Sequence, residues 1–195
     1  MEMTLKTNGE QEQKSKSAKL ILLFAMVSMT MMFAGLTSAF VVSKSRADWL
    51  KDFQIPIAFF YSTAVIIACS VAFYLAKKAI QKNNRSATSA YLLATLVLGI
   101  LFVALQITGF GQIIESGYYP TGQGSSITTT FLYVIALMHL LHVAGGLISL
   151  LIIIYNHFKQ KYNNTQTLGI ELGAMYWHFL DLLWVLLFLF LYFFK

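Results

Sequence analysis

Five ionisable side chains lie within long apolar stretches of this 195-residue chain. They are His139, His142, Glu171, His178 and Asp181. An ionisable group inside a membrane span costs about 2.5–3.5 kcal/mol on insertion scales, so each needs a physical reason to be there. Because histidines can ligate haem or metals and carboxyl groups can carry protons, these five residues form the candidate site of the protein.

The spacing of these residues places them on two helix faces. His139 and His142 are three residues apart, and Glu171, His178 and Asp181 follow one another at steps of seven and three. Such steps keep side chains on one face of a helix. A short connection at about 156–167 makes the two helices antiparallel neighbours, and the rise of about 1.5 Å per residue puts His142 and Asp181 at similar depth. The two faces are therefore predicted to meet, with His142 and Asp181 within hydrogen-bonding reach.

Three interpretations of this polar set stay open from spacing alone. The first, which we favour, is a structural clamp that fixes the packing of the last two helices. The second is haem ligation by His139 or His142 together with His178, since two histidines three residues apart on one helix cannot be opposite axial ligands of one haem. The third is a proton or ion relay through Glu171, His178 and Asp181.

Two further groups of residues are interpreted as packing elements. A methionine group resembles a soft copper site, but no Cys or His lies nearby, so apolar filling is favoured and no metal site is predicted. This group consists of Met26, Met29, Met31 and Met32. Four glycines within the apolar stretches are expected to let helix backbones approach closely. They are Gly35, Gly99, Gly145 and Gly146.

The composition supports a membrane setting for these groups. Hydrophobic residues make up 57% of the chain and charged residues only 11%, and the mean hydropathy is +0.67. Soluble domains carry about 25% charged residues, so a soluble enzyme, a secreted disulfide scaffold and a disordered chain are excluded. The single cysteine, Cys69, cannot form an internal disulfide. The net charge of +6 does not indicate nucleic acid, because the basic residues flank apolar runs.

Five apolar runs are long enough to cross a bilayer, which takes about 20 residues. They cover 20–42, 55–76, 90–114, 127–155 and 168–194. Runs of this length are far longer than barrel strands, so the sequence predicts an all-α, polytopic membrane protein with a bundle of five transmembrane helices. Residues 20–195 are expected to form this one domain. Residues 1–19, rich in Lys, Gln, Ser and Glu, are expected to be a disordered cytoplasmic tail.

The basic residues predict the orientation of the bundle. Ten lysines and arginines lie on the side of the N-terminal segment and four on the other side. The positive-inside rule therefore predicts an inside N-terminus and an outside C-terminus. A cleaved signal peptide is the competing interpretation of the first run, but its apolar region would be about 7–15 residues long, so an uncleaved span is favoured.

Two motifs on the last two runs resemble a known family. Residues 176–184, Tyr-Trp-His-Phe-Leu-Asp-Leu-Leu-Trp, follow Glu171 by five positions and resemble the last-helix signature of subunit III of cytochrome c oxidase. Residues 139–146, His-Leu-Leu-His-Val-Ala-Gly-Gly, are similar to the family's His-Gly-x-His-Val-x-x-Gly. The motifs occur in the right order on neighbouring spans, and the layout resembles the short five-helix bacterial form.

The resemblance implies a bundle with a V-shaped cleft that holds phospholipid. It implies a non-catalytic subunit of a bacterial haem-copper terminal oxidase, which carries electrons from cytochrome c to oxygen and pumps protons. The expected location is the bacterial inner (cytoplasmic) membrane. The expected partners are the catalytic subunit I, subunit II and a larger respiratory supercomplex. Haem and copper would reside in those subunits, with none bound by this chain, which would brace subunit I and support proton uptake.

By the same resemblance, the five ionisable residues are the family's polar positions, with no catalytic role. Trp177 and Trp184 are its aromatic positions, interpreted as contacts to lipid or to another subunit. The sequence departs from the family at Leu140, which replaces a glycine, and at Met29, which stands where the family often has a buried glutamate. The second departure puts a proton-handling role for that position in doubt.

Alternatives remain at this point. The same subunit of a quinol oxidase, or of a related nitric oxide reductase, would have the same sequence features, because other subunits select the electron donor. A stand-alone small transporter is a hypothesis of a different class, and the lack of inverted repeats and broken helices counts against it.

Overall fold

Five long helices make up most of the structure. The computed structural model describes residues 2–50, 54–122, 125–162 and 166–194, with side chains from residue 12 onward. The helices are α1 (Glu2–Val42), α2 (Ile57–Gln81), α3 (Arg85–Glu115), α4 (Ile127–Phe158) and α5 (Leu168–Phe194), and a 3-10 turn, η1 (Ser43–Ser45), follows α1. Each of the five is long and apolar enough to span a membrane. Across these described ranges no β-strand occurs. The predicted all-α class with five spans is confirmed.

The segment before the first span differs from the expectation. The sequence predicts a disordered tail over 1–19, whereas α1 already begins at Glu2. The apolar span provides a helical template that Lys, Glu and Gln, good helix formers, extend toward the N-terminus. An ion pair between Lys16 Nζ and Glu12 Oε1, 2.8 Å apart and four positions apart in sequence, supports this extension. The inside position of the N-terminus stays a prediction.

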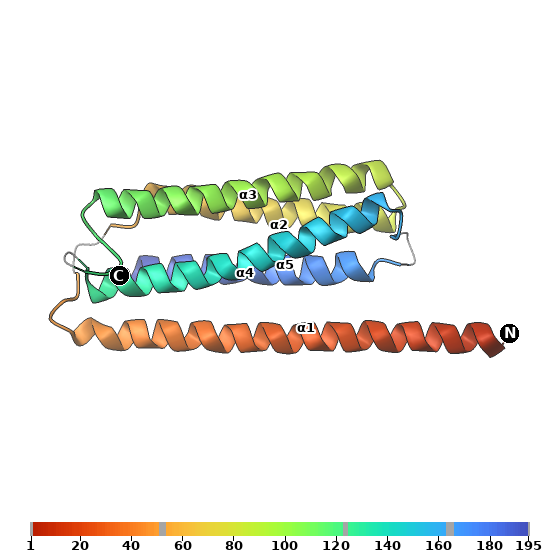
Figure 1. Ribbon diagram of the computed structural model, residues 1–195, viewed down its shortest axis with the longest axis horizontal. Helices are drawn as coiled ribbons and strands as arrows, with labels where there is room; N and C mark the ends of the chain where they lie inside the picture. Colours follow the sequence, from red (N-terminus) through yellow and green to blue (C-terminus); the bar gives the residue numbers. More distant parts are fainter. Residues whose placement is uncertain (1, 51–53, 123–124, 163–165, 195) are drawn as a thin grey trace.

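Four of the helices form a closed bundle and the first lies outside it (Figure 1). In this bundle α2 packs on α3, α3 on α4, α4 on α5, and α5 back on α2. Among the five described helices, α1 packs against α4 and α5 alone and is the least buried. The two chain termini lie at opposite ends (Figure 1). We call the end with the N-terminus, the α2–α3 turn and the α4–α5 connection the basic end.

Small side chains let α2 and α3 pack closely. The buried faces of both helices are lined by Ala, Ser, Cys, Thr and Gly, which allow backbones to approach within a membrane. A hydrogen bond from Gln106 Nε2 to Ser62 Oγ, 2.9 Å long, links the two faces. At Gly109 a Cβ atom would lie 2.5 Å from the ring of Phe59, so only glycine fits there without displacing that ring.

Three helices end in the same way, which keeps the connections short. Asn83, Gln160 and Gly117 follow α2, α4 and α3 and adopt positive φ angles of 57°, 57° and 83°. In each case the amide of this residue and the amide of the residue after it donate to carbonyl groups near the end of the helix. This Schellman arrangement satisfies backbone groups that would otherwise be unpaired near the membrane. Short turns of this kind place successive helices antiparallel, as the bundle requires.

A stripe with a seven-residue period attaches α1 to the bundle. Met26, Phe33 and Phe40 are its buried apolar residues, with 9%, 2% and 1% of their surfaces exposed. Lys19 continues the same spacing toward the basic end and pairs there with Glu171 on α5. A strict seven-residue repeat gives a narrow contact seam. The rest of α1 is therefore free to face lipid or another protein.

Candidate functional site

The polar residues of α5 face different neighbours and form no single cluster. In the structure α5 does pack beside α4, as the short connection predicts. The polar side chains, however, mostly face α2 and α1, which the sequence analysis did not consider as their partners. The predicted clamp between the last two helices is therefore replaced by contacts to other elements.

A polar seam joins α2 to α5, and we use this name for Thr63, Ser70 and Lys77 together with the α5 residues they face. Trp184 Nε1 donates to Thr63 Oγ1 at 3.1 Å. One heptad further along α2, Ser70 Oγ lies 2.7 Å from His178 Nδ1. After another heptad, Lys77 acts electrostatically on His178. Because the helices are antiparallel, a step of seven residues forward along α2 corresponds to a step of about six or seven residues backward along α5.

Glu171 lies near the basic end and ties α5 to α1. Its Oε2 lies 2.7 Å from Lys19 Nζ, and its Oε1 accepts a 2.7 Å hydrogen bond from Thr167 Oγ1. Lys77 of α2 also acts on this carboxylate. The side chain is 25% exposed, so the ion pair is a surface contact of modest strength, about 0–1 kcal/mol.

The predicted hydrogen bond between His142 and Asp181 is not formed. His142 Nδ1 instead lies 2.7 Å from the Met138 carbonyl oxygen, one turn earlier on the same helix. The polar link from α5 to this histidine goes to its backbone, because Tyr176 Oη donates to the His142 carbonyl oxygen at 3.0 Å. Asp181 is 4% exposed, and its two carboxyl oxygens have no hydrogen-bond partner in the described part of the chain. Helix rotation turns this carboxyl toward α2, away from α4.

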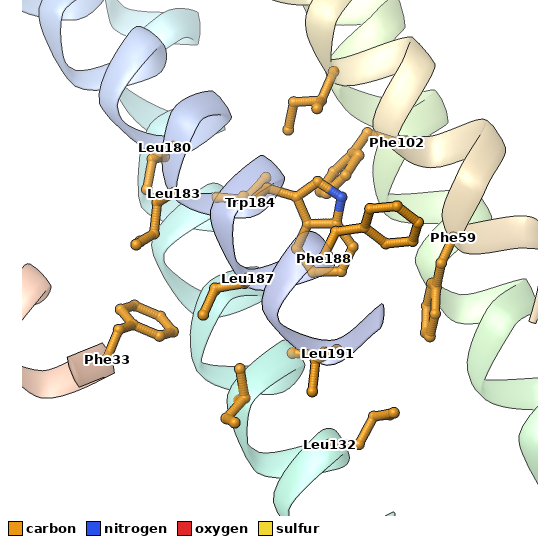
Figure 2. Close-up of a cluster of buried hydrophobic side chains, with 14 of the residues drawn as sticks. Phe33, Phe59, Phe102, Leu132, Leu180, Leu183, Trp184, Leu187, Phe188 and Leu191 are labelled. Carbon is orange, nitrogen blue, oxygen red and sulfur yellow. The ribbon is translucent and has the colours of Figure 1, made fainter. Parts of the chain in front are cut away.

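His139 lies in a fully buried aromatic box. Its ring centroid is 5.0 Å from that of Trp184, 5.9 Å from Phe102 and 6.4 Å from Phe33. Figure 2 shows Trp184, Phe102 and Phe33 in this core. Neither ring nitrogen of His139 has a hydrogen-bond partner among the described residues. His139 therefore faces aromatic side chains, His142 bonds the Met138 carbonyl, and His178 faces Ser70. The three histidines of the haem hypothesis thus have different neighbours.

Metal-binding side chains do not gather at one place in the described ranges. No group of three or more His, Cys, Asp or Glu side chains there is arranged to hold a metal ion. Met29, the residue at the family's carboxylate position, is half-buried on α1.

The two tryptophans interpreted as lipid or subunit contacts are core residues. Trp177 is 0% exposed and Trp184 1% exposed, so both indoles pack among residues of this chain, in place of the lipid or subunit contacts that the sequence predicts. Trp177 lies in a notch between α3 and α4, where Cβ atoms added at Gly99 and Gly146 would approach it to 3.1 and 3.5 Å. The predicted packing role of these two glycines is confirmed. Gly35, by contrast, has no atom within 4 Å of its added Cβ.

Gly145 marks a groove between α1, α4 and α5. The groove holds about 420 Å³ and is mainly apolar, with Leu22, Ile152 and Leu172 in its walls. Its wall residue Tyr162 also lines a second cavity of about 600 Å³ at the basic end, so the two are neighbours at this side chain.

The second cavity carries the basic rim of the groove. Lys14, Lys19 and Lys161 line it together with the carboxylates of Glu12 and Glu171, and Tyr162 lies at the junction. Burial raises the pKa of the Tyr162 phenol, so its hydroxyl stays protonated and able to donate a hydrogen bond. The arrangement combines an apolar channel inside the span with cations at one end.

Sequence reasoning missed the α2 side of the seam. Thr63, Ser70 and Lys77 are polar residues at a constant spacing of seven, and this repeat was the available signal. It was overlooked because Thr and Ser are common in membrane helices, where they bond to their own backbone. Lys19 was counted only as a topology signal.

Comparison with known proteins gives the family. The family model described as cytochrome c oxidase subunit III matches residues 2–195. This chain belongs to the cytochrome c oxidase subunit III family. The family is a subunit of an oxidoreductase, and the resemblance seen in the two motifs is thus confirmed over the whole chain.

Relatives in this family come from animals and bacteria, and each is named cytochrome c oxidase subunit 3. The Petromyzon marinus protein is 30% identical over 143 residues, which cover 73% of this chain and 51% of that protein. The Spodoptera frugiperda protein is 31% identical over 142 residues, covering 73% of this chain and 90% of that protein. The Synechocystis protein is 25% identical over 172 residues, covering 86% of this chain and 71% of that protein. The chain thus spans about half the length of several relatives.

Proposed function

We propose that this chain is the non-catalytic third subunit of a bacterial haem-copper terminal oxidase in the cytoplasmic membrane. Its expected partners are the catalytic subunit I and subunit II, which would hold the haem and copper. The match of the family model along residues 2–195 carries this proposal. The largely exposed α1 supports it, because an apolar helix held by one narrow stripe leaves a wide face for another membrane subunit.

Affinity purification from native membranes tests the proposal. A tagged chain, extracted in mild detergent, is expected to bring with it a much larger multi-span subunit and haem bands in a reduced-minus-oxidised spectrum. Mass spectrometry of the same sample identifies the partner subunits and thereby the electron donor, cytochrome c or quinol. Copurification with quinol-oxidase subunits would transfer the proposal to that enzyme, and a chain that purifies alone and colourless would contradict it.

The groove between α1, α4 and α5 is the proposed phospholipid site of the subunit. Its apolar channel suits an acyl chain, and the lysines at its rim suit a phosphate headgroup. The Tyr162 hydroxyl, protonated at physiological pH, is a further donor for phosphate oxygens.

A glycine-to-leucine change in the groove is expected to expel this lipid. At Gly145 an added Cβ has only the Tyr176 hydroxyl within 4 Å, at 3.8 Å, so Gly145→Leu fills the groove without disturbing the core. We expect retained phospholipid per complex, measured by native mass spectrometry, to fall by about one molecule. Gly35→Leu, where nothing lies within 4 Å, is the matched control. Equal lipid content in both variants would contradict the assignment.

Glu171 is the residue we propose for support of proton uptake. In Glu171→Gln the carboxylate charge is lost, and Lys19 and Lys77 are left as uncompensated cations that repel protons. Turnover of the complex is expected to slow about three- to tenfold at alkaline pH, where protons are scarce, with little effect at acidic pH. Assembly should persist, since an exposed ion pair contributes about 1 kcal/mol at most.

The control for this change is the exposed carboxylate of Glu12, which pairs with Lys16 at 2.8 Å on α1. Glu12→Gln removes a comparable charge away from the polar seam and is expected to leave the pH–rate profile unchanged. An unchanged profile for Glu171→Gln as well would rule out its role in proton uptake.

A further inference from the structure

The carboxyl group of Asp181 is buried without a counterion. Only 4% of the residue is exposed, and neither Oδ1 nor Oδ2 has a hydrogen-bond partner within the described ranges. The ion pairs found in those ranges involve Glu12, Asp48 and Glu171, and none reaches this position. A buried carboxylate that lacks a cation is far costlier than the neutral acid. A proton is the simplest ligand that removes this cost.

The groups around Asp181 supply a route for that proton. From α2, Cys69 and Ser70 act on the carboxyl, and Ser70 Oγ lies 2.7 Å from His178 Nδ1. Lys77, also on α2, faces His178. The cation that α1 contributes, Lys19, is taken by Glu171.

The remaining packed helix, α4, leaves this route undisturbed. His139 faces the aromatic box and His142 bonds the Met138 carbonyl, so the titratable groups of α4 turn to other partners. Ser70, which acts on the Asp181 carboxyl and lies 2.7 Å from His178 Nδ1, is therefore the hydroxyl through which we expect the acid and the imidazole to be linked.

We propose that Asp181, Ser70 and His178 form a proton-binding site in the membrane interior, in which Asp181 holds the proton and exchanges it through the Ser70 hydroxyl. When Asp181 is protonated, we expect its O–H to turn toward Ser70 Oγ, while the Ser70 O–H donates to His178 Nδ1 across the observed 2.7 Å contact. This site belongs to the α2–α5 interface and stands independently of the oxidase proposal, since it uses residues of this chain alone.

The transfer step conserves protons and charge. The acid proton moves to Ser70 Oγ while the Ser70 hydroxyl proton moves to His178 Nδ1. Asp181 becomes a carboxylate, His178 an imidazolium, and Ser70 is regenerated as a hydroxyl. The Lys77 cation opposes the imidazolium, so the neutral arrangement is the stored state and the charged one is transient.

Infrared spectroscopy of the protein purified from its native membranes tests the site. The carboxylic acid C=O band that disappears in Asp181→Asn is assigned to Asp181. At neutral pH we expect this band in the wild type. In Ser70→Ala it should shift, and its hydrogen–deuterium exchange should slow about tenfold or more, because the acid loses its acceptor and its exchange route.

A matched control distinguishes the proton site from the mere loss of a serine–histidine contact. Ser89 Oγ lies 2.9 Å from His157 Nε2 between α3 and α4, a similar pair at a different place. Ser89→Ala should leave the Asp181 band and its exchange rate unchanged. Ser70→Thr keeps the hydroxyl and is expected to retain wild-type exchange, which provides a test if Ser70→Ala does not fold.

Two results would overturn the proposal. Absence of any C=O band lost in Asp181→Asn would mean that Asp181 is ionised at neutral pH. A band whose position and exchange rate are equal in the wild type, Ser70→Ala and Ser89→Ala would mean that Ser70 is not on the route. Slow exchange in Ser70→Thr as in Ser70→Ala would also refute the hydroxyl's role.

Discussion

Trp184→Ala is expected to destabilise the bundle by about 3–5 kcal/mol, the range for removing a buried large aromatic side chain. The indole is 1% exposed and lies where α5 meets three other helices, with ring centroids of Phe59, Phe102 and His139 at 6.0, 5.4 and 5.0 Å. Its Nε1 also donates to Thr63 on α2. Inside a membrane, the association of helices depends on close packing. The packing energy lost at the cavity is therefore not recovered by water entering it.

The measurement is the unfolding free energy of the purified protein in detergent micelles, with two comparison variants. Trp184→Phe keeps most of the aromatic packing and loses the Thr63 bond, so it should lie between the wild type and the alanine variant. Phe193→Ala removes an aromatic ring from a residue that is 72% exposed and is expected to change stability little. Equal effects for Trp184→Ala and Phe193→Ala would contradict the central role of this indole.

Phe33→Ala is expected to release α1 from the bundle. The residue is the middle contact of the narrow stripe, with Met26 and Phe40 one heptad to either side. Its ring lies 6.4 and 5.9 Å from those of His139 and His142. Removal of a buried Phe side chain costs about 3–5 kcal/mol of packing free energy. Because α1 has one contact seam, this cost weakens almost entirely the docking of α1 on the bundle.

Carbodiimide cross-linking reports this docking directly. The Lys19 ammonium and the Glu171 carboxylate, 2.7 Å apart, are expected to form an amide that links α1 to α5 in the wild type. In Phe33→Ala the yield of this cross-link should fall severalfold. Phe24→Ala, on the exposed face of α1 with 66% exposure, is the control and should keep the wild-type yield. Full cross-linking in Phe33→Ala would show that α1 is held by other contacts.

The positions of the spans follow from the sequence because the bilayer sets a length and a polarity. Each predicted run lies within or close to an observed helix, and the fifth, 168–194, coincides with α5. The extra turn at the basic end that extends α2 to Gln81 contains Lys77, Lys78 and Gln81, polar helix formers that lower its hydropathy. The same property of Lys, Glu and Gln accounts for the helix that extends back to Glu2, through a segment for which the sequence predicts disorder.

Helical spacing also determined which polar residues share a face. His178 and Asp181 were placed together by their spacing of three, and in the structure both turn toward α2. The neighbour was wrong, because periodicity gives the angle between two residues of one helix but not the rotation of that helix within the bundle. That rotation is set by packing, as where Trp177 fits between Gly99 and Gly146.

The sequence by itself determined the number of spans, the family and the set of ionisable residues that could carry out chemistry. It did so because the bilayer and the family motifs act on local segments of the chain. Only the tertiary structure decided that Ser70 bonds His178, that Lys19 pairs with Glu171, and that Asp181 has no partner. The two contacts join residues 108 and 152 positions apart in sequence. Like the isolation of Asp181, they depend on how side chains of different volume fit together across the whole bundle.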